Sequence, residues 1–277
     1  MKAYVLNGID NLVKTEIEKP AYSDDEVLVH VMAAGICGSD IPRIFTTGAH
    51  VHPIIPGHEF SGKVVECGEG ATEWDGANVG IFPLIPCMKC DCCRKKQYQM
   101  CQNYSYLGSR CDGGFAEFVR VPKWNLVKLP EGLSFEEGAM LEPLAVSAHA
   151  VRKAVSGVSR DAYVCVWGVG TIGLMCIGVL KAMGYDNIIA VYKKEKQKEL
   201  AVRAGVSSDM CVDALSGEAF AKIDSLTGGS GVDVAFECVG RKESAEACVK
   251  IAGPGAKVMF VGNPASDMEF SKDAYWN

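Results

Sequence analysis

Three residues whose side chains commonly bind metals stand near the start of the chain: Cys37, His58 and Glu59. A thiolate, an imidazole and a carboxylate together suit zinc, and three protein ligands leave the fourth tetrahedral position for water or substrate. A catalytic zinc needs that open position because it acts as a Lewis acid on an oxygen atom. Each residue alone has a plainer interpretation, since a free cysteine packs well in a core. Their combination, with the run Gly57-His58-Glu59, favours a metal site.

Ser39 follows Cys37 by two residues. From there a hydroxyl can pass on the proton that an alcohol substrate loses, which is general acid–base work. We therefore predict a catalytic role for Ser39 and Glu59, and metal binding by Cys37, His58 and Glu59.

Glu142 is a lone acid in an apolar stretch that begins at Met140. Two interpretations stay open for it. An acid at a helix N-terminus is stabilised by the helix dipole. Alternatively, Glu142 is a further ligand of the catalytic metal.

A second group of cysteines consists of Cys87, Cys90, Cys93 and Cys101. Four thiolates fill a tetrahedral shell and leave no open position, which is the pattern of a structural zinc. Such an ion stabilises a lobe that has no apolar core of its own. An iron–sulfur cluster also uses four cysteines, but at other spacings. Cys92 falls outside the repeating spacing, so we interpret it as a bystander.

Composition narrows the class of protein. The chain has 277 residues, a 48% hydrophobic content and a formal net charge of -6. This length allows one or two domains, and the acidic balance argues against a nucleic-acid partner. The 13 cysteines occur without a signal-peptide pattern or an apolar run long enough for a membrane, which favours metal binding in the cytoplasm over disulfides.

The first part of the chain is β-rich. Short segments with β-branched residues, bounded by Gly, Pro or Asp, predict strands at Lys2–Leu6, Glu26–Ala34, Ser61–Cys67, Asn78–Phe82 and Phe115–Val121. No long helical period precedes Phe135, which favours a small barrel, with His58 and Glu59 on a loop that leads into a strand. Helical composition follows at 135–140 and 145–155, interrupted at Glu142-Pro143.

The second part alternates strand and helix. We expect strands at Ala162–Trp167, Asn187–Tyr192, Met210–Val212, Val232–Cys238 and Lys257–Val261. Helices are expected at Thr171–Met183, Glu195–Ala204, Gly217–Leu226 and Glu243–Ile251. This alternation predicts a parallel, doubly wound sheet of the Rossmann type.

A glycine-rich turn, Gly168-Val169-Gly170-Thr171-Ile172-Gly173, joins the first of these strands to its helix. Gly168 allows the tight turn, Gly170 lets the backbone approach a pyrophosphate, and Gly173 lets helix pack on strand. The helix N-terminus then offers free N–H groups to phosphates. The strand-turn-helix context supports a dinucleotide site that includes Ile172, although a purely structural turn has the same composition.

The end of the second strand bears on cofactor choice. An acid there hydrogen-bonds the ribose 2′-hydroxyl of NAD, but this strand ends at Tyr192, followed by Lys193 and Lys194. Two cations favour the 2′-phosphate of NADP. Asp186 precedes the strand and lies at its wrong end. A solvated helix start with Glu195 on the ribose is the alternative, so NAD and NADP both stay open.

These residues together resemble the zinc-dependent medium-chain alcohol and polyol dehydrogenases over essentially the whole chain. Within that family the chain is most similar to the galactitol-1-phosphate 5-dehydrogenases, with sorbitol and threonine dehydrogenases as more distant relatives. The likeness is carried by Cys37-Gly38-Ser39-Asp40-Ile41-Pro42-Arg43-Ile44-Phe45, Gly48-Ala49-His50, Gly57-His58-Glu59-Phe60-Ser61-Gly62 and Gly108-Ser109-Arg110-Cys111-Asp112-Gly113-Gly114-Phe115-Ala116-Glu117.

The resemblance implies an α/β architecture: a GroES-like catalytic domain over residues 1–148, then a Rossmann domain over 149–277. It implies a catalytic zinc on Cys37, His58 and either Glu59 or Glu142, and a structural zinc on the four-cysteine group. It also implies hydride transfer from a secondary alcohol of a polyol or polyol phosphate to NAD or NADP, and a homo-oligomer.

A phosphate on the substrate needs a local cation in this acidic chain. Arg43 is the first candidate, because the matching position lines the substrate pocket in the polyol branch of the family and a guanidinium suits phosphate. A surface arginine on a short helix is the plainer interpretation. His50 and Arg110 are further substrate candidates.

The resemblance also implies more chain than is present, since family members continue past Asn277 with a last Rossmann strand. The residues 271–277 have the composition of a helix start. We therefore expect a fragment with an unpaired sheet edge, for which homo-oligomerisation is doubtful. A zinc- and dinucleotide-binding protein without turnover is the alternative to the enzyme, as is a sorbitol or threonine dehydrogenase.

Overall fold

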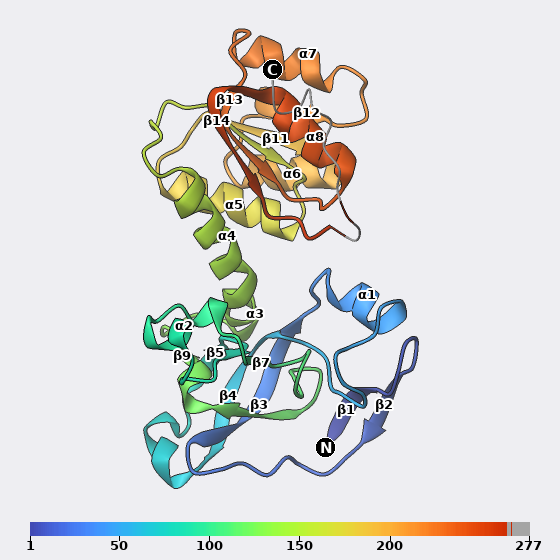
Figure 1. Cartoon of the computed structure of the whole chain (residues 1–277), viewed down its shortest axis with the longest axis vertical. Coiled ribbons are helices and arrows are strands. Elements are labelled where there is room, and N and C mark those ends of the chain that lie inside the picture. The colour runs from blue at the N-terminus through green and yellow to red at the C-terminus, as the bar shows by residue number, and fades with distance from the viewer. Residues whose placement is uncertain (265–266, 268–277) are drawn as a thin grey trace. The chain divides into compact units, whose positions relative to one another are not determined.

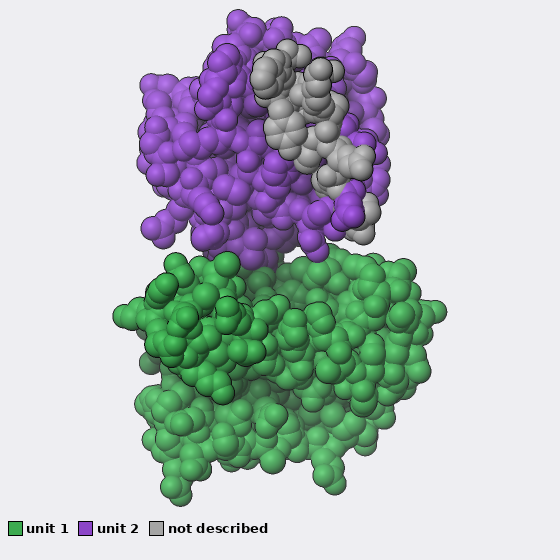
Figure 2. Space-filling view, viewed as in Figure 1, with its two compact units in different colours: residues 1–142 green, residues 143–277 purple. Residues whose placement is uncertain are grey.

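The computed structural model describes residues 1–264 and 267 and divides the chain into two compact units, Met1–Glu142 and Pro143–Asn277. Figure 2 distinguishes the two units by colour. The division falls in the first turn of helix α4 (Leu141–Ala154), and the boundary expected after residue 148 lies in the same helix. No helix in the described part is long and apolar enough to cross a membrane.

The first unit is built from short antiparallel strands (Figure 1). The strands are β1 (Lys2–Leu6), β2 (Leu12–Glu16), β3 (Glu26–Gly35), β4 (Glu59–Cys67), β5 (Asn78–Ile81), β6 (Leu84–Ile85), β7 (Ser105–Tyr106), β8 (Phe118–Pro122) and β9 (Leu126–Lys128). Its helices are α1 (Asp40–Phe45), α2 (Asp91–Arg94) and α3 (Phe135–Ala139), with 3₁₀ turns at Glu69–Trp74, Tyr98–Met100 and Lys123–Asn125. The main sheet has the order β8-β3-β4-β5-β9, and the pairs β1-β2 and β6-β7 form two-stranded sheets.

The core of the first unit lies on one face of this sheet. Val27 and Val29 of β3 pack with Phe60 and Val64 of β4 and are almost wholly buried. The period-two placement of branched and aromatic residues explains why these segments are strands. The five strands expected here are confirmed, with ends displaced by up to three residues.

The pairing of β3 with β4 brings the first metal-binding residues together. Gly35, the last residue of β3, stands opposite Glu59, the first residue of β4. Cys37 follows β3 by two residues and His58 precedes β4 by one. Since antiparallel partners place the end of one strand beside the start of the other, residues far apart in sequence meet at one end of the sheet.

The second unit is a parallel sheet covered by helices. Its strands are β10 (Val164–Trp167), β11 (Ile188–Tyr192), β12 (Cys211–Asp213), β13 (Val232–Glu237) and β14 (Ala252–Phe260), in the order β12-β11-β10-β13-β14. Its helices after α4 are α5 (Thr171–Ala182), α6 (Glu195–Arg203), α7 (Ala219–Leu226) and α8 (Lys242–Ile251), with a 3₁₀ turn at Ser208–Met210.

Both faces of this sheet are buried. Val164 and Val166 of β10 belong to a core shared with α4, α5 and α6, whereas Cys165 and Trp167 belong to a core shared with α7 and α8. Alternate residues of one strand therefore serve opposite faces, as a doubly wound sheet requires. The predicted Rossmann architecture is confirmed, and so is the α/β fold class.

Two details differ from the sequence expectations. Strand β14 starts at Ala252, five residues before the expected start. The added residues include Gly253, Pro254 and Gly255, which are poor strand formers, so the sequence does not indicate a strand there. A bulge between Val232 and Val234 accommodates this extension. The helix interruption expected at Glu142-Pro143 lies at Met140 instead, because Pro143 is tolerated in the first turn of α4. The helix start expected at 271–277 lies outside the described residues.

Candidate functional site

Cys37, His58 and Glu59 form one compact group. Their ligand atoms all lie within 4.8 Å of one another. His58 and Glu59 are buried, with exposed fractions of 5% and 7%, and Cys37 is half-buried. Nitrogen, sulfur and oxygen donors at this separation fit a zinc ion, whose ligands lie about 2.0–2.3 Å from the metal.

A buried acid that the sequence does not single out, Asp40, contacts two members of this group. Asp40 is fully buried at the start of α1, and its Oδ2 accepts a hydrogen bond from the Cys37 N–H at 3.1 Å. Its Oδ1 lies 3.5 Å from His58 Nδ1 and forms an ion pair with Arg43. Within the described part of the chain, His58 Nδ1 has no hydrogen-bond partner. Asp40 therefore lies where it can fix both the loop that carries Cys37 and the imidazole ring of His58.

The same contacts govern the charge of the imidazole. Burial lowers the pKa of His58, but the neighbouring Asp40 and Cys37 side chains outweigh that effect and raise it to about 10. Burial raises the pKa of Glu59, and the nearby His58 opposes this rise. Since zinc binds the neutral imidazole, we expect the metal to displace a proton from His58.

Glu142, the other predicted acid, lies outside the three-residue group. Its Oε1 accepts a hydrogen bond of 3.1 Å from the hydroxyl of Tyr106 in β7. Burial is the main cause that raises the pKa of Glu142, and His58 opposes it. The His58 and Tyr106 rings meet edge to face with centroids 5.8 Å apart, so Glu142 is near the group without being part of it.

The predicted proton-relay and substrate residues differ in their positions. Ser39 Oγ donates to Cys37 Sγ at 3.3 Å, beside the metal-binding group. Arg43 is half-buried and reaches the group through Asp40. His50 and Arg110 are exposed, and the Arg110 guanidinium lies over the Tyr104 ring at 4.6 Å.

The four-cysteine group is also brought together, since the sulfur atoms of Cys87, Cys90, Cys93 and Cys101 all lie within 4.8 Å of one another. Cys90 Sγ lies 3.5 Å from Cys93 Sγ and 3.9 Å from Cys101 Sγ. Backbone hydrogen bonds from Gln102 and Cys93 lower the pKa of Cys90 to about 6, which favours the thiolate that a metal binds. None of the chain's cysteines forms a disulfide, and Cys92 is not part of the group.

The glycine turn has the geometry that a dinucleotide site requires. Gly168 has φ of +98°, a conformation that side chains rarely adopt. A Cβ at Gly173 would lie 2.0 Å from Gly168 O, so close packing of α5 on β10 needs glycine there. At Gly170 a Cβ would meet nothing within 4 Å, which leaves space beside the N-terminus of α5. Ile172 is half-buried and packs on the core.

The residues after β11 form an exposed basic turn. The Lys193 and Lys194 N–H groups both donate to Gln197 Oε1, at 3.0 and 3.1 Å. Neither lysine side chain has an acidic partner among the described residues, whereas Glu195 is paired with Lys198 at 3.2 Å. Tyr192 is half-buried at the strand end.

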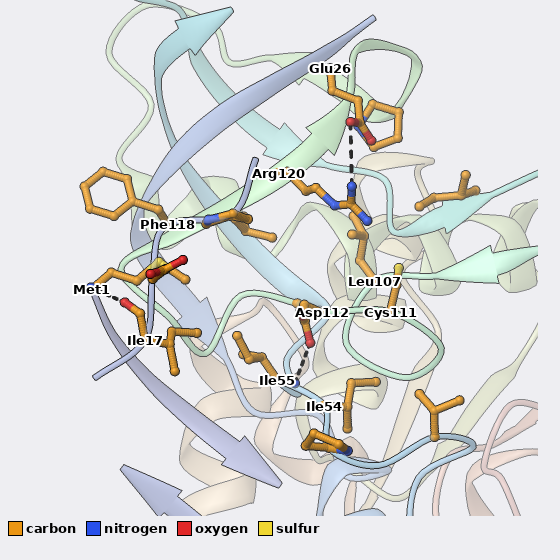
Figure 3. Close-up of a pocket in the computed structure, with 18 residues that line it drawn as sticks. Met1, Ile17, Glu26, Ile54, Ile55, Leu107, Cys111, Asp112, Phe118 and Arg120 are labelled. Carbon is orange, nitrogen blue, oxygen red and sulfur yellow. Dashed lines mark hydrogen bonds and ion pairs between the residues drawn. The ribbon is translucent and has the colours of Figure 1, made fainter. Parts of the chain in front are cut away.

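A separate cavity of about 420 Å³ in the first unit contains none of the predicted site residues. Figure 3 shows Asp112 bonded to the Ile55 backbone, at 2.9 Å, and Arg120 directed at Glu26, 4.0 Å away. The rest of the cavity wall is mainly apolar, and the side chains of Asp112, Arg120 and Glu26 are engaged with the protein. We therefore assign no chemistry to it.

Comparisons with known proteins agree with this geometry. The family model for the alcohol dehydrogenase GroES-like domain matches residues 23–131, and that for zinc-binding dehydrogenases matches residues 171–275. Galactitol 1-phosphate 5-dehydrogenase of Escherichia coli is 34% identical over 274 residues, which are 98% of this chain and 78% of that protein. The chain belongs to the zinc-dependent medium-chain alcohol and polyol dehydrogenases.

Other members of this dehydrogenase family show the same likeness. Sorbitol dehydrogenase of Bacillus subtilis is 28% identical over 274 residues, 96% of this chain and 76% of that protein. The crystal structure of the Escherichia coli galactitol-1-phosphate dehydrogenase superposes with a TM-score of 0.89 at 33% identity, covering 99% of this chain and 79% of that one. A zinc-binding dehydrogenase of Sinorhizobium meliloti bound to NADP superposes with a TM-score of 0.90 at 30% identity, covering 99% and 80%.

The comparisons confirm the predicted resemblance, including the particular similarity to galactitol-1-phosphate and sorbitol dehydrogenases. Zinc and a nicotinamide dinucleotide are confirmed as the cofactors of this family of dehydrogenases. The number of zinc ions, the residues that hold them and the substrate stay predictions.

Proposed function

We propose that the chain oxidises a secondary alcohol of a polyol or polyol phosphate, with galactitol 1-phosphate as the first substrate to test, and transfers the hydride to NADP. One observation carries the proposal: Cys37, His58 and Glu59 place three zinc-type ligand atoms within 4.8 Å, next to the hydroxyl of Ser39. This set combines an incomplete metal shell with a group that can move a proton.

Each residue has a definite part in the proposed reaction. Cys37, His58 and Glu59 would hold the zinc, which supplies Lewis acidity at the substrate oxygen. Ser39 takes the hydroxyl proton of the substrate and passes it outward, because its Oγ lies beside Cys37 Sγ and is half-buried. The glycine turn after β10 would hold the pyrophosphate of the dinucleotide, whose nicotinamide would supply the hydride acceptor.

A phosphate group on the substrate is supported by Arg43. Its guanidinium is within the buried network of the site, and Asp40 occupies only part of its donor fork. The galactitol 1-phosphate 5-dehydrogenase of Escherichia coli, whose name specifies a phosphorylated polyol, adds to this support.

The choice of NADP is supported by Lys193 and Lys194. Both are exposed after β11 and have no acidic partner in the described part of the chain, so their charges are available to a 2′-phosphate. The NADP in the similar Sinorhizobium meliloti structure agrees with that choice.

The test is a steady-state assay of the zinc-loaded protein. Galactitol 1-phosphate, galactitol, sorbitol and L-threonine are each assayed with NAD and with NADP. We expect the highest kcat/KM for the phosphorylated polyol with NADP, and no turnover by the Cys37→Ser variant. If none of the four compounds reduces NAD or NADP, the proposal is overturned. A preference for sorbitol or L-threonine would replace its substrate.

A further inference from the structure

The contact between Tyr106 and Glu142 is not used in the proposed reaction. Tyr106 ends the short strand β7 and Glu142 lies in the first turn of α4, so the pair joins segments that are distant in sequence. The hydroxyl of Tyr106 donates to Glu142 Oε1 at 3.1 Å, and the ring stands edge-on to His58 at 5.8 Å. Both side chains are half-buried.

Two glutamates thus lie near one metal-binding group, but their positions and hydrogen bonds differ. Glu59 lies within 4.8 Å of the other ligand atoms and against Gly35, with the Cys37 thiol as its hydrogen-bonding neighbour. Glu142 is outside the group, with one oxygen engaged by Tyr106. A carboxylate that accepts a hydrogen bond from a fixed phenol is held in place and loses some of its ability to bind a metal.

We propose that Tyr106 is a positioning residue that holds Glu142 outside the zinc ligand set. The inference rests on the proposed function, because it concerns the position that the substrate oxygen needs. Cys37, His58 and Glu59 then remain the three protein ligands, and the fourth position stays free for the substrate. Without the phenol hydroxyl, Glu142 competes with the substrate for that position.

The variant Tyr106→Phe removes the hydroxyl and retains the ring that packs against His58. The readout is the visible spectrum of the cobalt-substituted protein, in which the d–d bands change when a ligand is added. The Cys37→Ser variant, which retains the four-cysteine group, gives the spectrum to subtract. We expect the Tyr106→Phe spectrum to show an added ligand and the Tyr106→Phe/Glu142→Gln spectrum to resemble that of the unmodified protein.

Kinetics give a second readout. Loss of one hydrogen bond to a carboxylate corresponds to a change of about tenfold in an equilibrium constant. We expect Tyr106→Phe to raise KM for the alcohol by about tenfold with little change in kcat, and Glu142→Gln to reverse the rise. An unchanged cobalt spectrum in Tyr106→Phe, or a change that persists in the double variant, would overturn the proposal.

The two readouts separate this inference from the proposed function. The spectra need metal binding only, so an expected spectral change in a protein that oxidises none of the four compounds rejects the proposed function and leaves the role of Tyr106 standing. If the unmodified protein oxidises the polyol phosphate but the Tyr106→Phe variant has an unchanged cobalt spectrum, the proposed function stands and the role of Tyr106 is rejected.

Discussion

At the scale of single residues, Gly35 determines where Glu59 can lie. The two stand opposite each other in the β3–β4 pair, and a Cβ at Gly35 would come within 2.4 Å of Glu59 Oε2. A side chain at position 35 would therefore displace the carboxylate from Cys37 and His58. Glycine at position 35 is therefore needed for Glu59 to lie beside Cys37 and His58.

We expect Gly35→Ala to weaken zinc binding by about tenfold or more, the size of effect seen when the residues around metal ligands are changed. Competition with a chromophoric chelator measures the change. Gly38→Ala is the matched control, because a Cβ there meets nothing within 4 Å. Equal losses in the two variants would contradict the role given to Gly35.

Arg43 carries a second prediction at this scale. One charge-assisted contact with a phosphate contributes about 1.5–3 kcal/mol, so Arg43→Ala should raise KM for a polyol phosphate by at least about tenfold. The KM for the unphosphorylated polyol should change less, through the lost ion pair with Asp40. Arg94→Ala, which removes an exposed arginine paired with Asp91, serves as the control. An equal rise for both substrates would remove Arg43 from the phosphate site.

Residue types and spacing select the side chains that the structure brings together in two groups, because ligand chemistry restricts the choice to a few residue types. They do not predict Asp40, whose importance comes from complete burial and from a contact between helix α1 and His58, 18 residues further along the chain. The hydrogen bond between Tyr106 and Glu142 cannot be predicted from local sequence either, since no short-range pattern relates residues 36 positions apart.

At the scale of elements, we expect the end of β11 to set which dinucleotide is preferred. We expect Tyr192→Asp to shift binding towards NAD, because the new carboxylate accepts a hydrogen bond from a ribose 2′-hydroxyl and repels a 2′-phosphate. The ratio of the dissociation constants for NAD and NADP, followed by fluorescence, measures the shift.

Asp186→Asn is the control for that prediction. Asp186 precedes β11 and pairs with Lys181, so its loss should leave the ratio unchanged. If the unmodified protein already binds NAD far more tightly than NADP, the two lysines after β11 do not have the role proposed for them.

The strength of the local pattern explains which elements were predicted. β10, β11 and β13 are buried on both faces and contain runs of branched residues, so their place in the sequence was evident. β6 and β7 have two residues each, too few for any period, and helix α1 has only six residues. Such elements exist because of their surroundings, and local sequence does not reveal them.

At the scale of the whole molecule, the two units have separate cores. Neither the core beneath β3 and β4 nor those on the two faces of β10 draws residues from both units. The four-cysteine segment is poor in buried apolar residues, with only Cys93 and Cys101 buried among its ligands. Its order should therefore depend on its metal.

We expect Cys90→Ser to lower the melting temperature by several degrees, since each kcal/mol lost corresponds to about 2–4 °C in a protein of this size. Cys37→Ser should leave a folded protein without turnover and a smaller shift, because an open site contributes chiefly chemistry. Calorimetry of both variants measures the difference. Equal losses of stability would contradict the division of labour between the two sites.

The compactness of the four-cysteine segment has a consequence for the order in which metals are acquired. Its ligands all lie within 87–101, so closing the loops between them is entropically cheap and fast, on a scale of about 10–100 ns for a ten-residue loop. The group at Cys37, His58 and Glu59 forms only after β3 has paired with β4. A full-length chain that folds from the unfolded state should therefore capture zinc first at its cysteines, and under zinc limitation it should accumulate as folded protein that lacks the ion needed for catalysis.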